Sequence, residues 1–173
     1  MSWSQPPDRP LRSRRLGMGW IGIGLTFVLT GCLGPRPVPL GGLNRMLAQQ
    51  GSRREPSLSG RWLALIANRQ GRDQVELVDV ERQLPVPLPG LNRPDALPLS
   101  VSVSAAGDRL AVVRQVAGRT ELVLHRRTLM SSEPISMVPA GVPRRAVLRA
   151  DGREIAVEVS RQGLLQVDLI AVP

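Results

Sequence analysis

The sequence predicts an all-β protein that contains three repeats of antiparallel strands, each resembling one blade of a propeller. One hairpin-like phrase occurs three times, as GRWLALIANRQG at residues 60–71, GDRLAVVRQVAG at residues 107–118 and GREIAVEVSRQG at residues 152–163. The three copies align without a gap, and their final glycines are 47 and then 45 residues apart. A period in the mid-forties is typical of four-stranded propeller blades. The repeats therefore favour a partial propeller.

The first 31 residues have the pattern of an export signal. Four arginines between residues 9 and 15 precede an uncharged apolar run at residues 16–29. A membrane-spanning helix needs about 18 apolar residues. This run has fourteen residues, four of them glycine, so it fits the core of a signal peptide that is removed on export. The pair Arg14 and Arg15 leaves both the general and the twin-arginine export route open.

The apolar run ends in Leu29, Thr30, Gly31 and Cys32, which resembles the bacterial lipobox of an aliphatic residue, two small residues and a cysteine. The small residues give the signal peptidase access to an extended backbone. Cys32 is the only cysteine, which excludes an intramolecular disulfide. The resemblance implies that Cys32 is lipidated on sulfur and becomes the mature N-terminus. The lipid would anchor the protein to a membrane facing the periplasm, and the sequence does not distinguish the inner from the outer membrane.

Residues 32–57 are expected to form a flexible tether between the lipid and the body. Prolines alternate at positions 35, 37 and 39, and two glycines follow. Proline removes backbone donors and glycine loosens the chain, so a sheet is disfavoured here. A coil of this length spans about 25–30 Å. Residues 44–51 could form one or two helical turns, too few to be stable alone.

The body, residues 58–173, divides into repeats at about residues 58–94, 95–141 and 142–173. In the third copy Ile155, Val157 and Val159 alternate with small or acidic residues, which is typical of a half-buried strand. The first two copies are apolar on both sides, as in a strand covered on both faces. A glycine turn and a second strand follow in each copy. Two further strand candidates, at residues 96–104 and 133–139, give four strands per period.

The stretch RADGREIAVEVSRQG at residues 149–163 resembles the repeat of the TolB-type periplasmic propellers, and residues 57–71 and 104–113 resemble it more loosely. That repeat has an Asp-Gly turn, a basic residue, an apolar strand and a second turn. The resemblance implies a propeller-type scaffold, but family members have about six blades and a further N-terminal domain. Propellers need about four to eight blades to close. Three repeats therefore require either a homodimer that completes the ring or a smaller, sandwich-like body.

The composition argues against nucleic acid and against metal or other cofactors. All 23 basic residues are arginine and the formal net charge is +9. An exported protein does not normally meet nucleic acid, however, and beyond Cys32 the only aromatic rings are Trp62 and His125, too few for base stacking. A zinc site is also not expected, because the chain has one histidine and its one cysteine would be acylated.

No enzyme is expected. His125 is the only histidine, and in the ungapped alignment it occupies the position of Val78 and Ile170, which indicates a structural role. A serine hydrolase would have to combine His125 with one of four nearby serines, and the sequence has no GxSxG turn to present one. The four candidates are Ser102, Ser104, Ser131 and Ser132.

The sequence therefore predicts a lipid-anchored, non-catalytic envelope protein that binds a protein or peptide partner. The alternative is a small envelope hydrolase, or a protein that binds glycans or anionic polymers, on the same scaffold. Two arginine pairs, Arg126 with Arg127 and Arg144 with Arg145, are the candidate residues for an anionic partner. They also fit solubilising loop charges.

Overall fold

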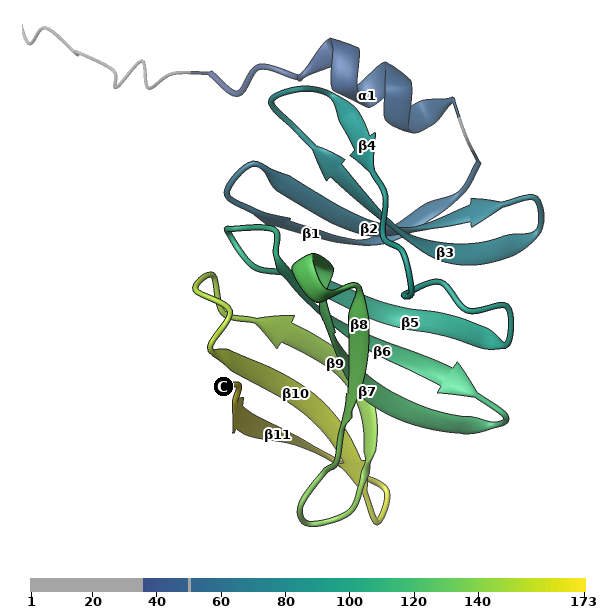
Figure 1. Cartoon of the computed structure of the whole chain (residues 1–173), viewed down its shortest axis with the longest axis vertical. Helices are drawn as coiled ribbons and strands as arrows, with labels where there is room; N and C mark the ends of the chain where they lie inside the picture. Colours follow the sequence, from purple (N-terminus) through teal and green to yellow (C-terminus); the bar gives the residue numbers. More distant parts are fainter. Residues whose placement is uncertain (1–35, 50) are drawn as a thin grey trace, which may run out of the picture. The chain divides into compact units, whose positions relative to one another are not determined.

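The computed structural model describes residues 36–49 and 51–173. Within the described residues, eleven strands form three antiparallel sheets, preceded by one α-helix, α1 (Gly41–Ala48) (Figure 1). The first sheet contains β1 (Arg53–Ser59), β2 (Trp62–Arg69), β3 (Arg72–Asp79) and β4 (Leu84–Val86). The second contains β5 (Ala96–Val103), β6 (Arg109–Val116), β7 (Arg119–Arg126) and β8 (Ser131–Ile135), with the 3₁₀ turn η1 (Arg127–Leu129) between the last two. The third contains β9 (Val142–Leu148), β10 (Glu154–Arg161) and β11 (Leu164–Ala171).

The repeated phrase forms the same hairpin in each sheet. Its two strands pair over eight residues without a break, as β2 with β3, β6 with β7 and β10 with β11. Both residues of each connecting turn have positive φ, which is the geometry of the two-residue turn that suits a twisted hairpin. These turn residues are Gln70 and Gly71, Ala117 and Gly118, and Gln162 and Gly163. The ungapped alignment of the three copies is thus also a structural alignment.

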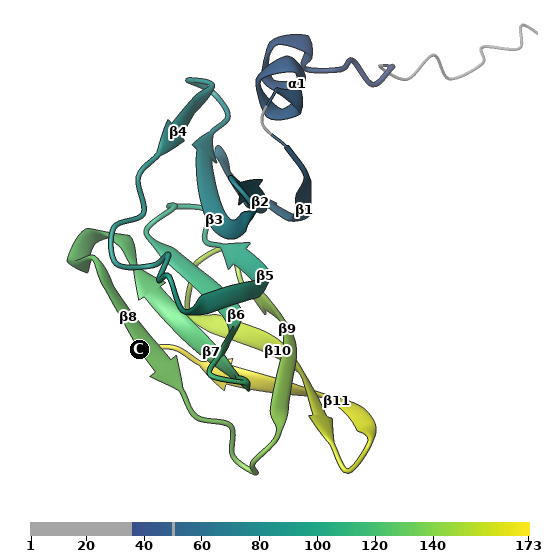
Figure 2. The ribbon, with the colours of Figure 1, turned by 90° about the vertical axis from the view of Figure 1, so that its right-hand side faces the viewer.

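The sheets pack in series, and each has two distinct faces (Figure 2). We call the face toward the next sheet in sequence the forward face and the opposite one the rear face. In the first sheet the forward face carries Trp62, Ala64, Ile66, Val75 and Leu77, which pack against the rear face of the second sheet. In the second sheet the forward face carries Ala111, Val113, Leu122 and Leu124, which pack against Ile155, Val157 and Val159 on the rear face of the third.

Equivalent contacts also join the sheets at their turns. A Cβ atom at Gly107 would lie 2.4 Å from the Trp62 ring, so the turn before β6 packs directly on an aromatic side chain of β2. One sheet later, Arg109 occupies the corresponding position and donates a 3.0 Å hydrogen bond to the Gly152 carbonyl oxygen. The repeated sequence therefore produces a repeated interface.

The all-β, three-sheet prediction is confirmed, including β5 within the candidate strand 96–104 and the β10–β11 hairpin. Three boundaries differ. The first sheet begins at Arg53, inside the expected tether, because residues 53–59 pair with β2 as an edge strand whose sequence has no clear apolar alternation. The helix begins at Gly41 rather than Asn44, and β8 covers residues 131–135 rather than 133–139.

Candidate functional site

The forward face of the third sheet carries a group of apolar side chains against which no other described sheet or helix packs. It carries Val142 and Val147 from β9, Ala156 from β10, and Leu165, Val167 and Leu169 from β11, and we call these six residues the open face. Leu169 is 78% exposed and Val167 is 71% exposed. The equivalent residues of the second sheet, Leu124 and Leu122, are 2% and 1% exposed. Aliphatic side chains at equivalent positions are thus buried in the second sheet and exposed in the third.

Strand β11 also leaves one backbone edge without a partner strand in the described part of the chain. The third sheet has the order β11-β10-β9, so β11 pairs with β10 alone (Figure 1). The equivalent strands β3 and β7 are paired on their outer side by β4 and β8. An unpaired edge of eight residues presents backbone donors and acceptors that can receive a strand from another chain.

At two positions of the repeat, the third sheet carries a residue that differs from those of the other two sheets. On the forward side of the inner strands, Ser57 and Ser102 occupy equivalent positions, opposite Ala64 and Ala111. Each hydroxyl accepts a hydrogen bond from a backbone N–H of the next sheet, from Val103 at 3.2 Å and from Leu148 at 2.8 Å. Val147, opposite Ala156, takes this position in the third sheet and cannot accept such a bond.

The second of these differences is at Glu158. It occupies the position that Ile66 and Val113 have in the other sheets, opposite Val167 on one side and Arg145 on the other. Glu158 forms no ion pair with another described residue, whereas the Arg145 Nε lies 3.8 Å from an Oε2 of Glu55 on β1. Glu158 and Arg145 are thus cross-strand neighbours that do not pair with each other, and the Arg145 guanidinium lies nearer to Glu55.

The two predicted arginine pairs lie on different sheets and in different surroundings. The Arg126 guanidinium pairs with Glu133 on the neighbouring strand. The Arg127 guanidinium lies over the Trp62 ring, 4.8 Å from its centroid, and so helps to join two sheets. Arg144 and Arg145 are both exposed on β9. The second pair is therefore the better placed for an external anion.

His125 is fully buried on β7, paired across the strands with Leu110, as Val78 pairs with Leu63. Its Nδ1 lies 2.9 Å from the Ser132 hydroxyl, and no hydrogen-bond partner of its Nε2 is found among the described residues. Burial lowers the pKa of His125 below its usual value of 6.5, which keeps the ring neutral near pH 7. A histidine without access to solvent is poorly placed as a general base for a substrate.

The remaining candidate serines have structural contacts. Ser104 donates a 2.7 Å hydrogen bond to Asp108 in its own turn and accepts one from the Arg109 N–H. Ser102 bonds the third sheet as described above, and the buried His125 holds Ser132. Ser131 lies at the start of β8, in register with Arg126. The described residues bring no carboxylate to His125, so they do not assemble a serine–histidine–acid triad.

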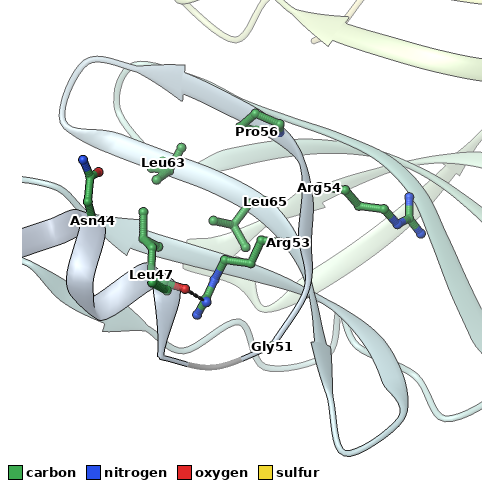
Figure 3. Close-up of a pocket in the computed structure, with 9 residues that line it drawn as sticks. Asn44, Leu47, Gly51, Arg53, Arg54, Pro56, Leu63 and Leu65 are labelled. Atoms are coloured by element: carbon green, nitrogen blue, oxygen red, sulfur yellow. Dashed lines mark hydrogen bonds between the residues drawn. The ribbon is translucent and has the colours of Figure 1, made fainter. Parts of the chain in front are cut away.

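A pocket of about 470 Å³ lies between α1 and the rear face of the first sheet (Figure 3). Leu47 of the helix and Leu63 and Leu65 of β2 form its apolar wall. Arg53 ties the helix to the sheet, because its guanidinium donates to the Leu47 carbonyl oxygen and pairs with Glu76 at 3.5 Å. From the sequence alone, the helix and Arg53 are expected to belong to the flexible tether. The spacing of Leu40, Leu43 and Leu47 was the available signal for an amphipathic helix.

Neither a metal cluster nor a membrane-crossing helix is present in the described ranges. Residues 36–49 and 51–173 contain no group of three or more histidine, cysteine, aspartate or glutamate side chains that could hold a metal ion. No helix within them is long and apolar enough to span a bilayer. The lipobox residues Leu29, Thr30, Gly31 and Cys32 lie outside the described residues.

The sheets and their repeated interfaces define a class of protein: a partial propeller built from antiparallel blades. Among solved structures the chain is similar to TolB from Acinetobacter baumannii, with a TM-score of 0.53 and 17% identity over 68% of this chain and 29% of that chain. It is also similar to a putative TolB from Agrobacterium tumefaciens, with a TM-score of 0.54 and 12% identity over 71% of this chain and 47% of that chain. The sequence matches no protein-family profile and no curated protein sequence.

These likenesses confirm the TolB-like fold that the repeat phrases predicted. At 17% and 12% identity they establish the fold alone. The chain spans less than half the length of either TolB structure.

Proposed function

We propose that this protein is a lipid-anchored, non-catalytic component of a bacterial envelope that binds another protein through the open face and the free edge of β11. The observation that carries the proposal is the exposure of Val167 and Leu169 on a face that is buried in the two preceding sheets. Contiguous exposed apolar surface marks interaction sites on soluble domains. Complete burial of one such side chain contributes about 1.5–3 kcal/mol.

Partner binding at this face has two physical components. The side chains of the open face supply apolar area, and the edge of β11 supplies backbone hydrogen bonds in a fixed direction. The first component favours any aliphatic surface, whereas the second favours an extended segment of protein. Together they support a protein or peptide ligand over a glycan.

The anchoring part of the proposal is supported by the sequence before residue 33. A basic head, a short apolar core and the lipobox ending in Cys32 occur in the order that export and lipidation require. The fold shared with TolB-type periplasmic propellers supports the same compartment. The non-catalytic role is supported by His125, the only histidine, which is buried and bonded to Ser132.

Anchoring is tested by labelling cells that make the protein with a palmitate analogue. The wild type should be labelled, and Cys32→Ala should remain unlabelled and accumulate as the longer precursor. Ser52→Ala, a change outside the lipobox, serves as the control and should be labelled like the wild type. Equal labelling of Cys32→Ala, or a mature N-terminus far from residue 32, would contradict the anchor.

Partner binding is tested by placing a photo-crosslinking amino acid at position 169 and, as a matched control, at position 84. Leu84 on β4 is 59% exposed but belongs to the first sheet. Irradiation of intact cells should give a covalent protein adduct from position 169 and none from position 84. No adduct from either position, or equal adducts from both, would refute a binding role for the open face.

A second candidate, binding of an anionic polymer, is favoured by the exposure of Arg144 and Arg145 on β9. Replacing both with alanine should weaken binding to dextran sulfate and reduce its dependence on salt, because fewer counterions are released. The same change at Arg126 and Arg127 should have less effect on salt dependence, since the Arg126 side chain is 19% exposed and pairs closely with Glu133, whereas the Arg145 side chain is 63% exposed. Equal salt dependence in the wild type and the Arg144, Arg145 variant would refute this candidate.

A further inference from the structure

We propose that the protein bound by the open face is a second copy of this chain, with the two third sheets packed face to face about a two-fold axis. This inference rests on the proposed function, because it names the partner of the same surface. It rests on how the sheet faces are covered, on the position of α1, and on Val147 and Glu158 of the third sheet.

The described part of the chain has six sheet faces, and their coverage differs. Four of them pack against one another in two interfaces, the first between the first and second sheets and the second between the second and third sheets. The rear face of the first sheet lies under α1, where Leu43 is buried and Leu63 and Leu65 line the pocket. Within the described residues, the open face is the one sheet face on which no other sheet or helix packs, although Leu58 on the rear face of the first sheet is also exposed. An identical chain therefore offers one free sheet face, its own open face.

A head-to-tail arrangement would place the open face of one copy on the rear face of the first sheet of the other and close a ring of six sheets. That rear face is occupied by α1, which Arg53 holds through the Leu47 carbonyl oxygen. Ring closure would require α1 to leave. A two-fold arrangement uses the same patch on both copies, needs no displacement and closes the assembly at two chains.

The open face also lacks the residue that joins consecutive sheets. Ser57 and Ser102 each bond a backbone N–H of the following sheet, and Val147 stands at the equivalent position. A further sheet packed in series on the third would not form this hydrogen bond. A valine instead adds apolar area, which suits the packing of two aliphatic faces against each other.

Charge at the centre of the face is self-complementary. Glu158 and Arg145 are direct cross-strand neighbours, so the third sheet carries one negative and one positive residue at adjacent positions of this face. Rotation by 180° can bring the Arg145 of one copy toward the Glu158 of the other. Such a pair would compete with the 3.8 Å contact between Arg145 and Glu55 of the same chain.

The test uses two differently tagged copies of the full chain, expressed together, extracted from membranes in mild detergent and purified through one tag. The second tag should co-purify with the wild type. Leu169→Arg in both copies should reduce its recovery at least tenfold, because the charge would be buried at the interface. Leu129→Arg is the matched control, since Leu129 is 64% exposed but lies in η1, and it should leave recovery unchanged.

The outcomes separate this inference from the proposed function. Absence of the second tag from the purified wild type, or equal recovery from Leu169→Arg and the wild type, overturns the two-fold dimer. If the photo-crosslinker at position 169 then gives an adduct with a different protein, binding through the open face stands and the partner is not a second copy. If it gives no adduct at all, both proposals fail.

Discussion

The packing of the first sheet on the second makes a quantitative prediction for two glycines with similar backbones and different surroundings. Gly107 has φ of +68° and Gly118 has φ of +77°. A Cβ at Gly107 would lie 2.4 Å from the Trp62 ring, whereas a Cβ at Gly118 would meet nothing within 4 Å. Alanine at either position is strained by about 1–2 kcal/mol because of the positive φ. Only alanine at position 107 must also displace a neighbour.

The displaced neighbour has little freedom. Trp62 is 7% exposed, and the guanidinium groups of Arg61 and Arg127 each lie 4.8 Å from its ring centroid. Overpacking of this kind costs about 1–3 kcal/mol. Gly118→Ala should therefore lower the free energy of unfolding by about 1–2 kcal/mol, and Gly107→Ala by about 2–5 kcal/mol.

Urea unfolding followed by far-ultraviolet circular dichroism measures both values on the same protein preparation. The change in midpoint should be clearly larger for Gly107→Ala at an unchanged slope, since the slope reports the surface exposed on unfolding. Equal midpoint shifts for the two variants would show that the turn before β6 does not pack on Trp62. The first and second sheets would then not be joined by the contact between Gly107 and Trp62.

Two other predictions concern single side chains. Ala111 is fully buried between the second and third sheets, whereas the equivalent Ala156 is half-buried on the open face. Leucine should therefore lower the free energy of unfolding by about 1–3 kcal/mol at position 111 and by less than about 0.5 kcal/mol at position 156. Urea unfolding measures both values at concentrations low enough to keep the chain monomeric. Equal losses would contradict the difference in burial. Because burial lowers the pKa of His125 below 6.5, the unfolded chain takes up a proton before the folded chain does, and the free energy of unfolding should fall as the pH drops below about 6.5. His125→Val, which restores the residue of position 78, should abolish this slope between pH 5 and 6.5, and an unchanged slope would show that another group is responsible.

Much of the fold could be predicted because the repeat fixes both pairing and turns. Glycines at positions 71, 118 and 163 mark equivalent turns, and apolar residues at fixed offsets from them define the paired strands. The first strand was missed for a physical reason. Residues 53–57 are RREPS, which has no alternation of apolar residues. Strand β1 forms because it pairs with the apolar strand β2, and not because of a strand propensity of its own.

The open face could not be predicted from the same signals. Leu122 and Leu124 have the same chemistry and the same place in the repeat as Val167 and Leu169. Whether such residues are core or surface depends on the presence of a following sheet, which no local pattern encodes. The repeat alignment likewise predicts that Ala156, like Ala111, packs between neighbouring sheets. Ala156 is instead half-buried, because no described sheet follows the third.

The central claim is that the forward face is buried in the second sheet and uncovered in the third. The most direct test compares the thermal unfolding midpoints of Leu124→Arg and Leu169→Arg in the monomeric chain. Leu124 is 2% exposed and Leu169 is 78% exposed, at equivalent positions of the repeat. A buried, unpaired charge costs about 3–5 kcal/mol, so Leu124→Arg should lower the midpoint by at least about 6 °C or prevent folding. Leu169→Arg should shift it by less than about 2 °C. Equal shifts for the two variants would contradict the claim.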